Sequence, residues 1–430
     1  MNNNDTIFAL SSGRGKAGVA VIRISGDDLG DMAARFIGRT ATPRRAYFTN
    51  LKDNAGDLID QCLVIYFAAP QSFTGTDVIE IQCHGADAVI KKIFEYLTTL
   101  GARMALPGEF SRRAFYNGKM DLADVDGLAA LLDAKTDMQR KWALRSLSGG
   151  DGKTYATWRR DMIDISAYAA AILDYDAGDL PGNIGEVLKQ RARKLYDDIM
   201  RALGHSNAAR AVRSGINVVL AGRPNVGKSS LFNTIVGANR AIVSDIPGTT
   251  RDVVSADVDI DGYLVHLMDT AGLRDSATDA IEKIGIARTR DEMADADIII
   301  HVFDAAPNAT AAANEIIVIN KSDLCDTRSD DAICISAKTG AGLDKLMAEL
   351  RRRLHSITDG ADTDVVINAR TKTLLEDAAA NIRDAIAAGD NWDIFAEHIR
   401  RGADAVGRIL GTISTADVMD ATFGQLCLGK

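Results

Sequence analysis

The stretch GRPNVGKS at residues 222–229 decides the fold of this chain. It follows the apolar run INVVLA at 216–221 and precedes LFNTIVG, which has the spacing of a helix. A glycine-rich turn between a strand and a helix is the setting of a phosphate-binding loop. Glycines at both ends of the turn let backbone N–H groups point inward at phosphate oxygens. We therefore expect Lys228 on the β- and γ-phosphates and the Ser229 hydroxyl on Mg²⁺.

Three further motifs come later in the chain, each directly after an apolar run with strand composition. They are DTAG at 269–272, NKSD at 320–323 and SAK at 336–338. Asp269 stands where a metal-linked carboxylate belongs. Asp323 can accept two hydrogen bonds from the exocyclic amine and ring N–H of guanine, a pair of donors that adenine does not offer. The four motifs in this order predict a GTP-binding domain built on a doubly wound parallel sheet.

The same motifs define the predicted nucleotide contacts. Lys321 is expected to stack its stem on the base, and Ala337 to offer its backbone N–H to the guanine oxygen. Thr250 in GTTRD supplies a second hydroxyl for Mg²⁺ beside Ser229. The full predicted set is Asn225, Val226, Gly227, Lys228, Ser229, Ser230, Ser244, Asp245, Ile246, Pro247, Gly248, Thr249, Thr250, Asp269, Thr270, Ala271, Gly272, Asn320, Lys321, Asp323, Ser336, Ala337 and Lys338.

Bulk composition is that of a soluble globular protein. The chain has 430 residues, 47% hydrophobic and 25% charged, enough for two or three domains. Its five cysteines are scattered with no CxxC pair, which argues against a disulfide framework or zinc site and for a reducing compartment. The start reads as no signal peptide, and no run of 18 apolar residues predicts a membrane span. The net charge of −9 does not favour nucleic-acid binding, but does not exclude it, because binding depends on a local basic face.

Changes of texture along the chain predict its domains. Residues 1–118 read as mixed α/β, with strand-like VAVIRIS and VIEIQC and helical IKKIFEYLTTL. Residues 119–212 are rich in Ala and Leu and read as helices, with a break at GGDG, and residues 359–430 return to helix. The predicted G domain, 213–358, lies between these helical parts. The predicted fold is therefore a multidomain chain of α/β and α parts, with the G domain inserted into a helical domain.

The motifs carry a family resemblance. Segment 216–357 resembles the small GTPase domains of the Era/TrmE class of P-loop GTPases. The whole chain resembles the MnmE (TrmE) family of tRNA wobble-uridine modification GTPases through VIRISG, QSFTGTDVIEIQCHG, LPGEFSRRAFYNGKMDLADVDGL, DIPGTTRD, DTAGLR, IEKIGI and CLGK, in that order. The resemblance implies that the N-terminal α/β domain binds folate and dimerises, that the inserted domain is Ras-like, and that the protein is a cytoplasmic homodimer.

The resemblance also fills a gap in the hydrolytic machinery. Leu273 follows DTAG where Ras-like switches carry a water-orienting Gln, and leucine cannot hydrogen-bond to water. The family pattern implies Glu282 as the water-orienting acid, although a solvated helix carboxylate is the alternative interpretation. It also implies K⁺ in place of an arginine finger, in G domains that pair face to face, with ligands Asn225, Ser244, Ile246 and Thr249.

In the first domain, the resemblance implies that folate contacts Arg23, Glu80, Lys119 and Lys430. Arg and Lys suit the glutamate tail of a folate, and a carboxylate suits the N–H pair of its pterin. Without the resemblance, Arg23 and Lys119 would read as ordinary surface charges. For Cys427 two roles stay open, nucleophilic attack on the uracil ring or simple packing. Prenylation is disfavoured, because a final Lys does not fit the C-terminal lipidation box.

The implied activity is addition of a carboxymethylaminomethyl or aminomethyl group at C5 of the wobble uridine (U34) of certain tRNAs. The carbon would come from a tetrahydrofolate derivative, 5-formyl or 5,10-methylene. FAD and NADH would belong to a flavoprotein partner, MnmG (GidA), in a heterotetramer, because this chain has no GxGxxG after a strand. No membrane partner is expected. The alternatives are a ribosome-assembly GTPase of the Era/EngA type and a non-enzymatic, GTP-timed scaffold. The short segment 305–319 predicts a stunted helix.

Overall fold

The computed structural model describes most of the chain as two compact units. The described residues are 5–174, 181–242, 254–270, 295–306, 311–324, 332–360, 365, 368–412 and 429. The first unit consists of Met1–Ala129, Ser146–Asp164 and Arg400–Lys430, and the second of Ala130–Arg145 and Ile165–Ile399. Each unit has its own sheet and its own apolar core.

A six-stranded sheet forms the centre of the first unit, in the order β3-β4-β5-β2-β1-β6. Its strands are β1 (Ile7–Leu10), β2 (Ala17–Gly26), β3 (Ala46–Lys52), β4 (Leu58–Phe67), β5 (Asp77–Gly85) and β6 (Arg103–Met104). Neighbours pair antiparallel except β1 and β6, which are parallel. Three helices accompany the sheet: α1 (Gly30–Ile37), α2 (Asp87–Thr99) and α3 (Glu109–Tyr116). The mixed α/β composition predicted for this region is confirmed.

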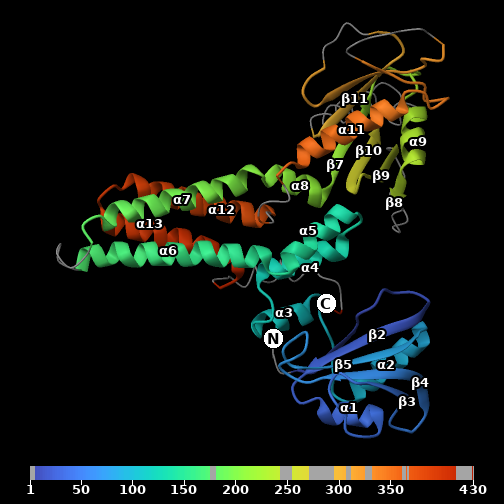
Figure 1. Cartoon of the computed structure of the whole chain (residues 1–430). Coiled ribbons are helices and arrows are strands. Elements are labelled where there is room, and N and C mark those ends of the chain that lie inside the picture. Colours follow the sequence, from blue (N-terminus) through green and yellow to red (C-terminus); the bar gives the residue numbers. More distant parts are fainter. Residues whose placement is uncertain are drawn as a thin grey trace, which may run out of the picture. The chain divides into compact units, whose positions relative to one another are not determined.

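The two faces of this sheet have different surroundings. Side chains alternate between faces along a strand, so Ile22 and Ile24 of β2 point to one face and Arg23 to the other. Ile22 and Ile24 belong to an apolar core that includes residues of α1 and α2, the two helices that lie along the sheet in Figure 1. The opposite face carries Arg23 and its register partner on β5, Glu80.

Helices dominate the middle and end of the chain. They are α4 (Leu122–Asp133), α5 (Asp137–Leu147), α6 (Gly150–Asp174), α7 (Ile184–Gly204), α8 (Ser206–Ser214), α12 (Ala369–Ala387) and α13 (Trp392–Leu410). In α7 the buried residues Leu188, Ala192, Leu195 and Ile199 recur every three or four positions, as an amphipathic helix requires. This stripe faces inward and α12 packs alongside α7 (Figure 1).

The helical region predicted from residue 119 onward contains more breaks between helices than its composition indicates. A break does occur near GGDG, but it lies at residues 148–149, since α5 ends at Leu147 and the last three residues of GGDG form the start of α6. A second break separates α4 from α5, where Gln139 Oε1 accepts from the backbone N–H of Thr136 at 3.2 Å and Thr136 Oγ1 accepts from that of Gln139 at 3.5 Å. This reciprocal pair is a capping box, so Thr136 begins a new helix.

The second unit contains a seven-stranded sheet in the order β13-β12-β11-β7-β10-β9-β8. Its strands are β7 (Ile216–Ala221), β8 (Arg240–Ile242), β9 (Val254–Ile260), β10 (Tyr263–Asp269), β11 (Ile298–Phe303), β12 (Glu315–Ile319) and β13 (Ile333–Cys334). The run from β10 to β13 is parallel, and β8 and β9 add an antiparallel edge. Helices α9 (Lys228–Ala238) and α11 (Leu343–Thr358) lie against this sheet (Figure 1).

Both faces of the central strand β7 are covered. Val218 and Leu220 pack in one cluster with apolar residues of α8, α9 and α11, and Val219 packs in another cluster on the opposite face. The first cluster also contains Trp142 and Ala143 of α5, which are 6% and 0% exposed. A mostly parallel sheet buried on both faces is the doubly wound architecture that the motifs predict, so the predicted fold class is confirmed.

Two remaining expectations concern single segments. In the span 305–319, predicted to hold a stunted helix, residue 305 is in a bend, residues 313–314 form a turn, β12 occupies 315–319, and residues 307–310 lie outside the description. Of the helices that the structure describes, none has the length and apolar character needed to cross a membrane. The three predicted domain boundaries, after residues 118, 212 and 358, remain predictions.

Candidate nucleotide-binding site

The loop between β7 and α9 has a backbone that only glycine accommodates at two positions. Gly222 and Gly227 have φ angles of 149° and 97°. A Cβ at Gly222 would lie 2.3 Å from the carbonyl oxygen of Val302, and one at Gly227 would lie 2.2 Å from Nδ2 of Asn320. The glycines of the phosphate-binding motif are therefore required both by conformation and by close neighbours.

Lys228 is held inside this loop. Its ammonium group donates to the carbonyl oxygens of Gly222 and Arg223, at 2.9 Å in each case. The residue is only 5% exposed, although it carries a positive charge. A buried ammonium surrounded by a turn of backbone is positioned for an anion that lies in the turn, which matches the role predicted for Lys228.

Strand β10 brings a carboxylate to the start of α9. Asp269, the last residue of β10, is fully buried, and its Oδ2 accepts a hydrogen bond from Ser229 Oγ at 2.7 Å. Thr270, the next residue, donates its hydroxyl to the carbonyl oxygen of Leu220 at 2.9 Å, which ties the end of β10 to β7. Because β7 and β10 are parallel neighbours, their carboxyl ends meet at one edge of the sheet. The hydroxyl and carboxylate predicted around Mg²⁺ therefore lie together.

Asn320, directly after β12, connects two loops. Its Nδ2 donates to the carbonyl oxygen of Val226 at 2.9 Å, and its Oδ1 accepts from the backbone N–H of Ala337, also at 2.9 Å. The side chain is 4% exposed. One buried amide therefore holds the phosphate-binding loop and the SAK loop at a fixed separation, which sets the distance between the phosphate and base ends of the site.

The neighbouring residues complete the predicted base side. Lys321, with φ of 65°, donates its ammonium to the carbonyl oxygen of Asn225 at 2.8 Å. Ser336 donates its hydroxyl to Asp323 Oδ1 at 2.7 Å. This hydrogen bond lowers the pKa of the Asp323 carboxyl, so the group is ionised near neutral pH and can only accept hydrogen bonds. The exposed Asp323 carboxylate suits the N–H pair of guanine.

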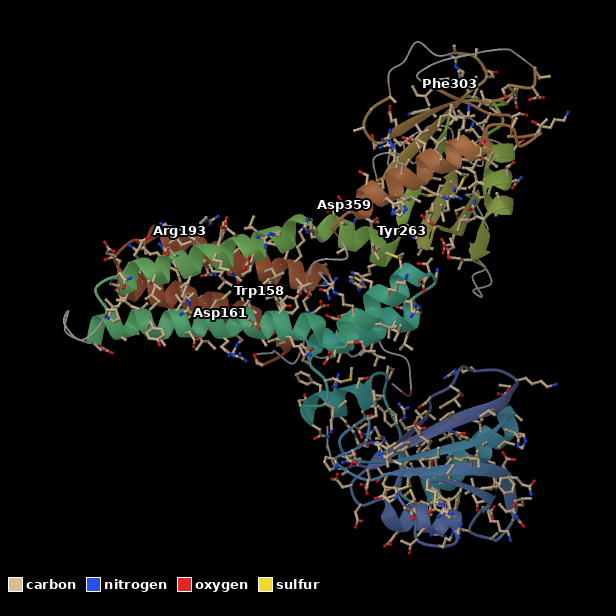
Figure 2. The ribbon with its side chains drawn as sticks, viewed as in Figure 1. Trp158, Asp161, Arg193, Tyr263, Phe303 and Asp359 are labelled. Carbon is tan, nitrogen blue, oxygen red and sulfur yellow. The ribbon has the colours of Figure 1, made fainter. Side chains whose placement is uncertain are left out.

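The described part of the site therefore gathers residues from four strand ends. Figure 2 shows Phe303, the last residue of β11, near the same end of the sheet, and Tyr263, the first residue of β10, toward the other end. Of the other predicted contacts, Val226 is buried, whereas Ser230 and Lys338 are exposed. Those outside the described residues are Ser244, Asp245, Ile246, Pro247, Gly248, Thr249, Thr250, Ala271, Gly272 and Glu282.

The donor set fits a nucleotide with a magnesium ion. A turn that a Cβ would obstruct, a buried ammonium, and a hydroxyl paired with a carboxylate are the groups that hold phosphates and a hard cation. Mg²⁺, when bound there, supplies positive charge beside the phosphates. Lys228, Ser229 and Asp269 would hold the two together.

One residue that contacts the site could not be predicted from any sequence motif. Thr234, in the second turn of α9, donates its hydroxyl to the carbonyl oxygen of Ala337 at 3.1 Å and so braces the SAK loop against the helix. Its position six residues after Lys228 belongs to no motif. The bridging role of Asn320 was likewise not predicted, although the residue itself was placed in the site.

Two comparisons with known proteins extend over nearly the whole chain. Residues 6–119 match the family described as "GTP-binding protein TrmE N-terminus", and residues 122–427 match the "MnmE helical domain" family. A protein of Rhizobium etli named "tRNA modification GTPase MnmE" is 39% identical, with 99% of each chain covered. A protein of Parvibaculum lavamentivorans with the same name is 40% identical, covering 99% of this chain and 100% of its own length. The chain belongs to the MnmE (TrmE) family.

Solved structures give partial matches to the same chain. The G domain of the FeoB iron transporter of T. maritima is 26% identical over 34% of this MnmE-family chain and 99% of its own, with a TM-score of 0.25. The cytosolic domain of that transporter in a GDP form is 18% identical over 45% of this chain and 98% of its own, with a TM-score of 0.24.

The folate site expected from the MnmE family falls partly on described residues. Arg23 donates to Glu80 Oε1 through Nε at 3.0 Å and Nη2 at 2.8 Å, and both side chains are largely buried. The Arg23 guanidinium also lies over the ring of Phe73, 5.1 Å from its centroid. Lys119 is exposed in the turn after α3. The structure thus joins two of the four predicted residues in one ion pair.

The C-terminal tail of this MnmE-family chain is described only at Gly429, because Cys427 and Lys430 lie outside the described residues. Gly429 accepts a hydrogen bond from the Ser11 hydroxyl at 3.0 Å. Its φ is 98°, and a Cβ there would lie 2.3 Å from the carbonyl oxygen of Leu10. This close packing holds Gly429 at the end of β1, in the unit that carries Arg23 and Glu80.

Proposed function

We propose that this chain is a GTP-hydrolysing enzyme of tRNA modification, the activity for which its relatives are named. The observation that carries the proposal is the meeting of four motifs at one edge of the second sheet, where Asn320 joins the phosphate-binding loop to the SAK loop. Family membership over both the N-terminal and the helical regions favours this activity over a ribosome-assembly role, because an Era-type GTPase shares only the G domain.

In finer detail, we assign the modification to C5 of the wobble uridine, with a one-carbon unit from a tetrahydrofolate derivative. Arg23 and Glu80 lie together, and Gly429 of the CLGK motif packs on β1 in the same unit, which supports a site for the carbon donor there. Glu80 would bind the pterin N–H groups of the folate while Arg23 holds the Glu80 carboxylate in place, and Lys119 and Lys430 would suit the glutamate tail at the other end of the folate. A flavoprotein of the MnmG type would supply FAD and NADH in a cytoplasmic complex.

Hydrolysis by this chain would depend on K⁺ and on a homodimer. A potassium ion beside the phosphates supplies positive charge that offsets charge growing in the transition state. Of its four predicted ligands, Asn225 lies in the described loop with φ of 64° and an exposed side chain, so its amide is accessible to a cation. Ser244, Ile246 and Thr249 would complete the set, and Glu282 would orient the water.

The decisive experiment measures GTP turnover by the full-length protein in KCl and in NaCl at equal ionic strength. Faster turnover in KCl is expected, and equal rates would reject the K⁺-activated class. Failure to bind GDP or GTP in either salt would reject the GTPase assignment itself. A parallel assay of wobble-uridine modification with the flavoprotein partner compares wild type with Cys427→Ser. Loss of modification with intact GTPase supports a catalytic thiol and excludes a scaffold, whereas retained modification assigns Cys427 a packing role.

A further inference from the structure

The first unit carries a basic segment at the edge of its sheet. Residues 32–52 contain four arginines and one lysine and no acidic residue, in a chain with a net charge of −9. The segment ends in β3, which is the outermost strand of the six-stranded sheet on that side. Three of its arginines, Arg39, Arg44 and Arg45, lie just before this strand and are exposed. We refer to these three as the edge arginines.

Aromatic rings fix the position of all three side chains. The guanidinium groups of Arg39 and Arg45 lie over the ring of Tyr47, 5.1 and 5.4 Å from its centroid. That of Arg44 lies over Phe67 at 5.7 Å and donates one hydrogen bond to the carbonyl oxygen of Gln71. A stacked guanidinium has little freedom left to lose, and its planar edge still presents several N–H donors.

These arginines are not neutralised by acids. In the part of the chain that the structure describes, none of the three forms an ion pair, whereas Arg103 of the same unit pairs with both Asp5 and Glu109. The charges of Arg39 and Arg45 also affect the Tyr47 phenol, on which both side chains stack. The hydrogen bond from Thr42 lowers the pKa of the buried Tyr47 phenol, and the charges of Arg45 and Arg39 lower it further. The cluster is therefore a preorganised positive surface without a carboxylate partner.

We propose that the edge arginines bind the sugar–phosphate backbone of tRNA, and this inference rests on the proposed tRNA-modifying function. Guanidinium groups bind phosphate oxygens through two parallel N–H donors, and such contacts provide most of the sequence-independent affinity for nucleic acid. A local patch of this kind resolves the apparent conflict between an acidic chain and a polyanionic substrate. The competing role for charge at an edge strand is protection against edge-to-edge aggregation.

The test is a titration of labelled tRNA with the full-length protein, followed by fluorescence anisotropy at several KCl concentrations. Each phosphate contact that is lost should reduce the slope of log affinity against log salt by about 0.7–0.9. We expect Arg39→Gln/Arg45→Gln to reduce the magnitude of the slope by about 1.4–1.8 and to weaken binding about 25- to 60-fold near 0.1 M salt. Arg44→Gln alone should reduce it by about 1. Because Arg44 does not touch Tyr47, this variant still provides a test if the double variant fails to fold.

The matched control is Lys372→Gln/Arg383→Gln, which removes two charges from exposed positions of α12 where each pairs with an acid. Its slope should equal that of wild type. GTP turnover without tRNA should be unchanged in all variants. Wild-type slope and affinity in the edge variants would overturn the inference, and self-association of those variants with unchanged tRNA affinity would assign the charges to edge protection. A wild-type protein that binds no tRNA would instead reject the proposed function.

Discussion

The hydroxyl of Ser229 donates to Oδ2 of Asp269 at 2.7 Å and so joins the first turn of α9 to the last residue of β10. The two residues are 40 positions apart in sequence, and their parallel strands bring them to the same edge of the sheet. Asp269 is fully buried, and this hydroxyl is one of the partners that orient its carboxylate. Loss of either group should therefore disturb the predicted magnesium site.

Ser229→Ala removes the hydroxyl and leaves the loop backbone intact. We expect GTP turnover to fall about 100-fold, equivalent to about 3 kcal/mol of transition-state stabilisation, because the metal loses a ligand and Asp269 loses one hydrogen-bond donor. Turnover measured across a Mg²⁺ titration checks this, and the variant should need more Mg²⁺ for half-maximal rate. An unchanged Mg²⁺ dependence would contradict the assignment.

Gly227→Ala places a Cβ 2.2 Å from Nδ2 of Asn320 at a φ of 97°. The Asn320 amide has to move, which breaks its hydrogen bonds to Val226 and Ala337, so we expect lower thermal stability together with loss of nucleotide binding. Gly237→Ala on α9 is the control, because no atom lies within 4 Å of its added Cβ. That control should stabilise the protein by about 0.5–1 kcal/mol. Equal melting temperatures for the two variants would show that the close contact is not limiting.

Asp323→Asn replaces an acceptor of two N–H groups by an amide with one acceptor and one donor. We expect GTP affinity to fall about 100-fold, since the guanine amine then faces an N–H group. Xanthosine triphosphate, which has an oxygen at that ring position, should bind the variant better than it binds wild type. Competition binding with both nucleotides gives the comparison. An unaltered preference between the two nucleotides would show that Asp323 does not recognise the base.

Burial raises the pKa of the Asp124 carboxyl to about 6, and the charges of Asp121 and Asp151 add to the shift. An acid whose folded pKa exceeds its ordinary value of 3.8 destabilises the fold when ionised, so the cost grows as pH rises from about 4 to about 6 and is complete above that. Asp124→Asn should remove this cost, because an amide oxygen can still accept the hydrogen bond that Asp124 receives from the Asp121 N–H.

Denaturant unfolding of wild type and Asp124→Asn at pH 4, 6 and 8 measures this effect. The variant should be about 2 kcal/mol more stable than wild type at pH 8 and close to it at pH 4. A stability difference that is constant over this range would mean that Asp124 does not change protonation there.

Gly429→Ala tests whether the tail must pack on β1. The added Cβ would lie 2.3 Å from the Leu10 carbonyl oxygen, which is backbone and cannot swing aside, at a φ of 98°. We expect the tail to be displaced, with loss of most tRNA modification and normal GTP turnover. Gly18→Ala on β2, where no atom lies within 4 Å, should retain both activities. Full tRNA modification by Gly429→Ala would show that the packing of Gly429 on β1 is not required for the reaction.

The G domain could be predicted well from sequence because its chemistry depends on short contiguous motifs. Each motif follows an apolar strand, and parallel strands place their carboxyl ends together, so Lys228, Ser229 and Asp269 could be assigned to one site. The helix start at Thr136 was also readable, since Thr136 and Gln139 have the spacing of a capping box. The predicted helical region contains no break between residue 119 and GGDG, so it misses this helix start.

Other features depend on long-range packing that local patterns do not encode. The pairing of Arg23 with Glu80 follows from the register of β2 and β5, and the sequence does not fix that register. The bridge from Asn320 to Val226 and Ala337 requires three loops in their final positions. The edge arginines could not be predicted as a binding surface from sequence. Their arrangement depends on stacking against Tyr47 and Phe67 and on the lack of ion-pair partners among the described residues.

The presence of Trp142 and Ala143 in the apolar cluster of the second sheet affects where the GTPase can be cut from the chain. A fragment bounded at residues 213 and 358 would lose α5 and nearly all of α8, including Ala208 and Ala209. That face of the sheet would keep α9 and α11 but lose part of its apolar cover, so we expect the excised fragment to aggregate in solution. A version that retains these two helices should remain monodisperse, which makes them part of the smallest stable GTPase module.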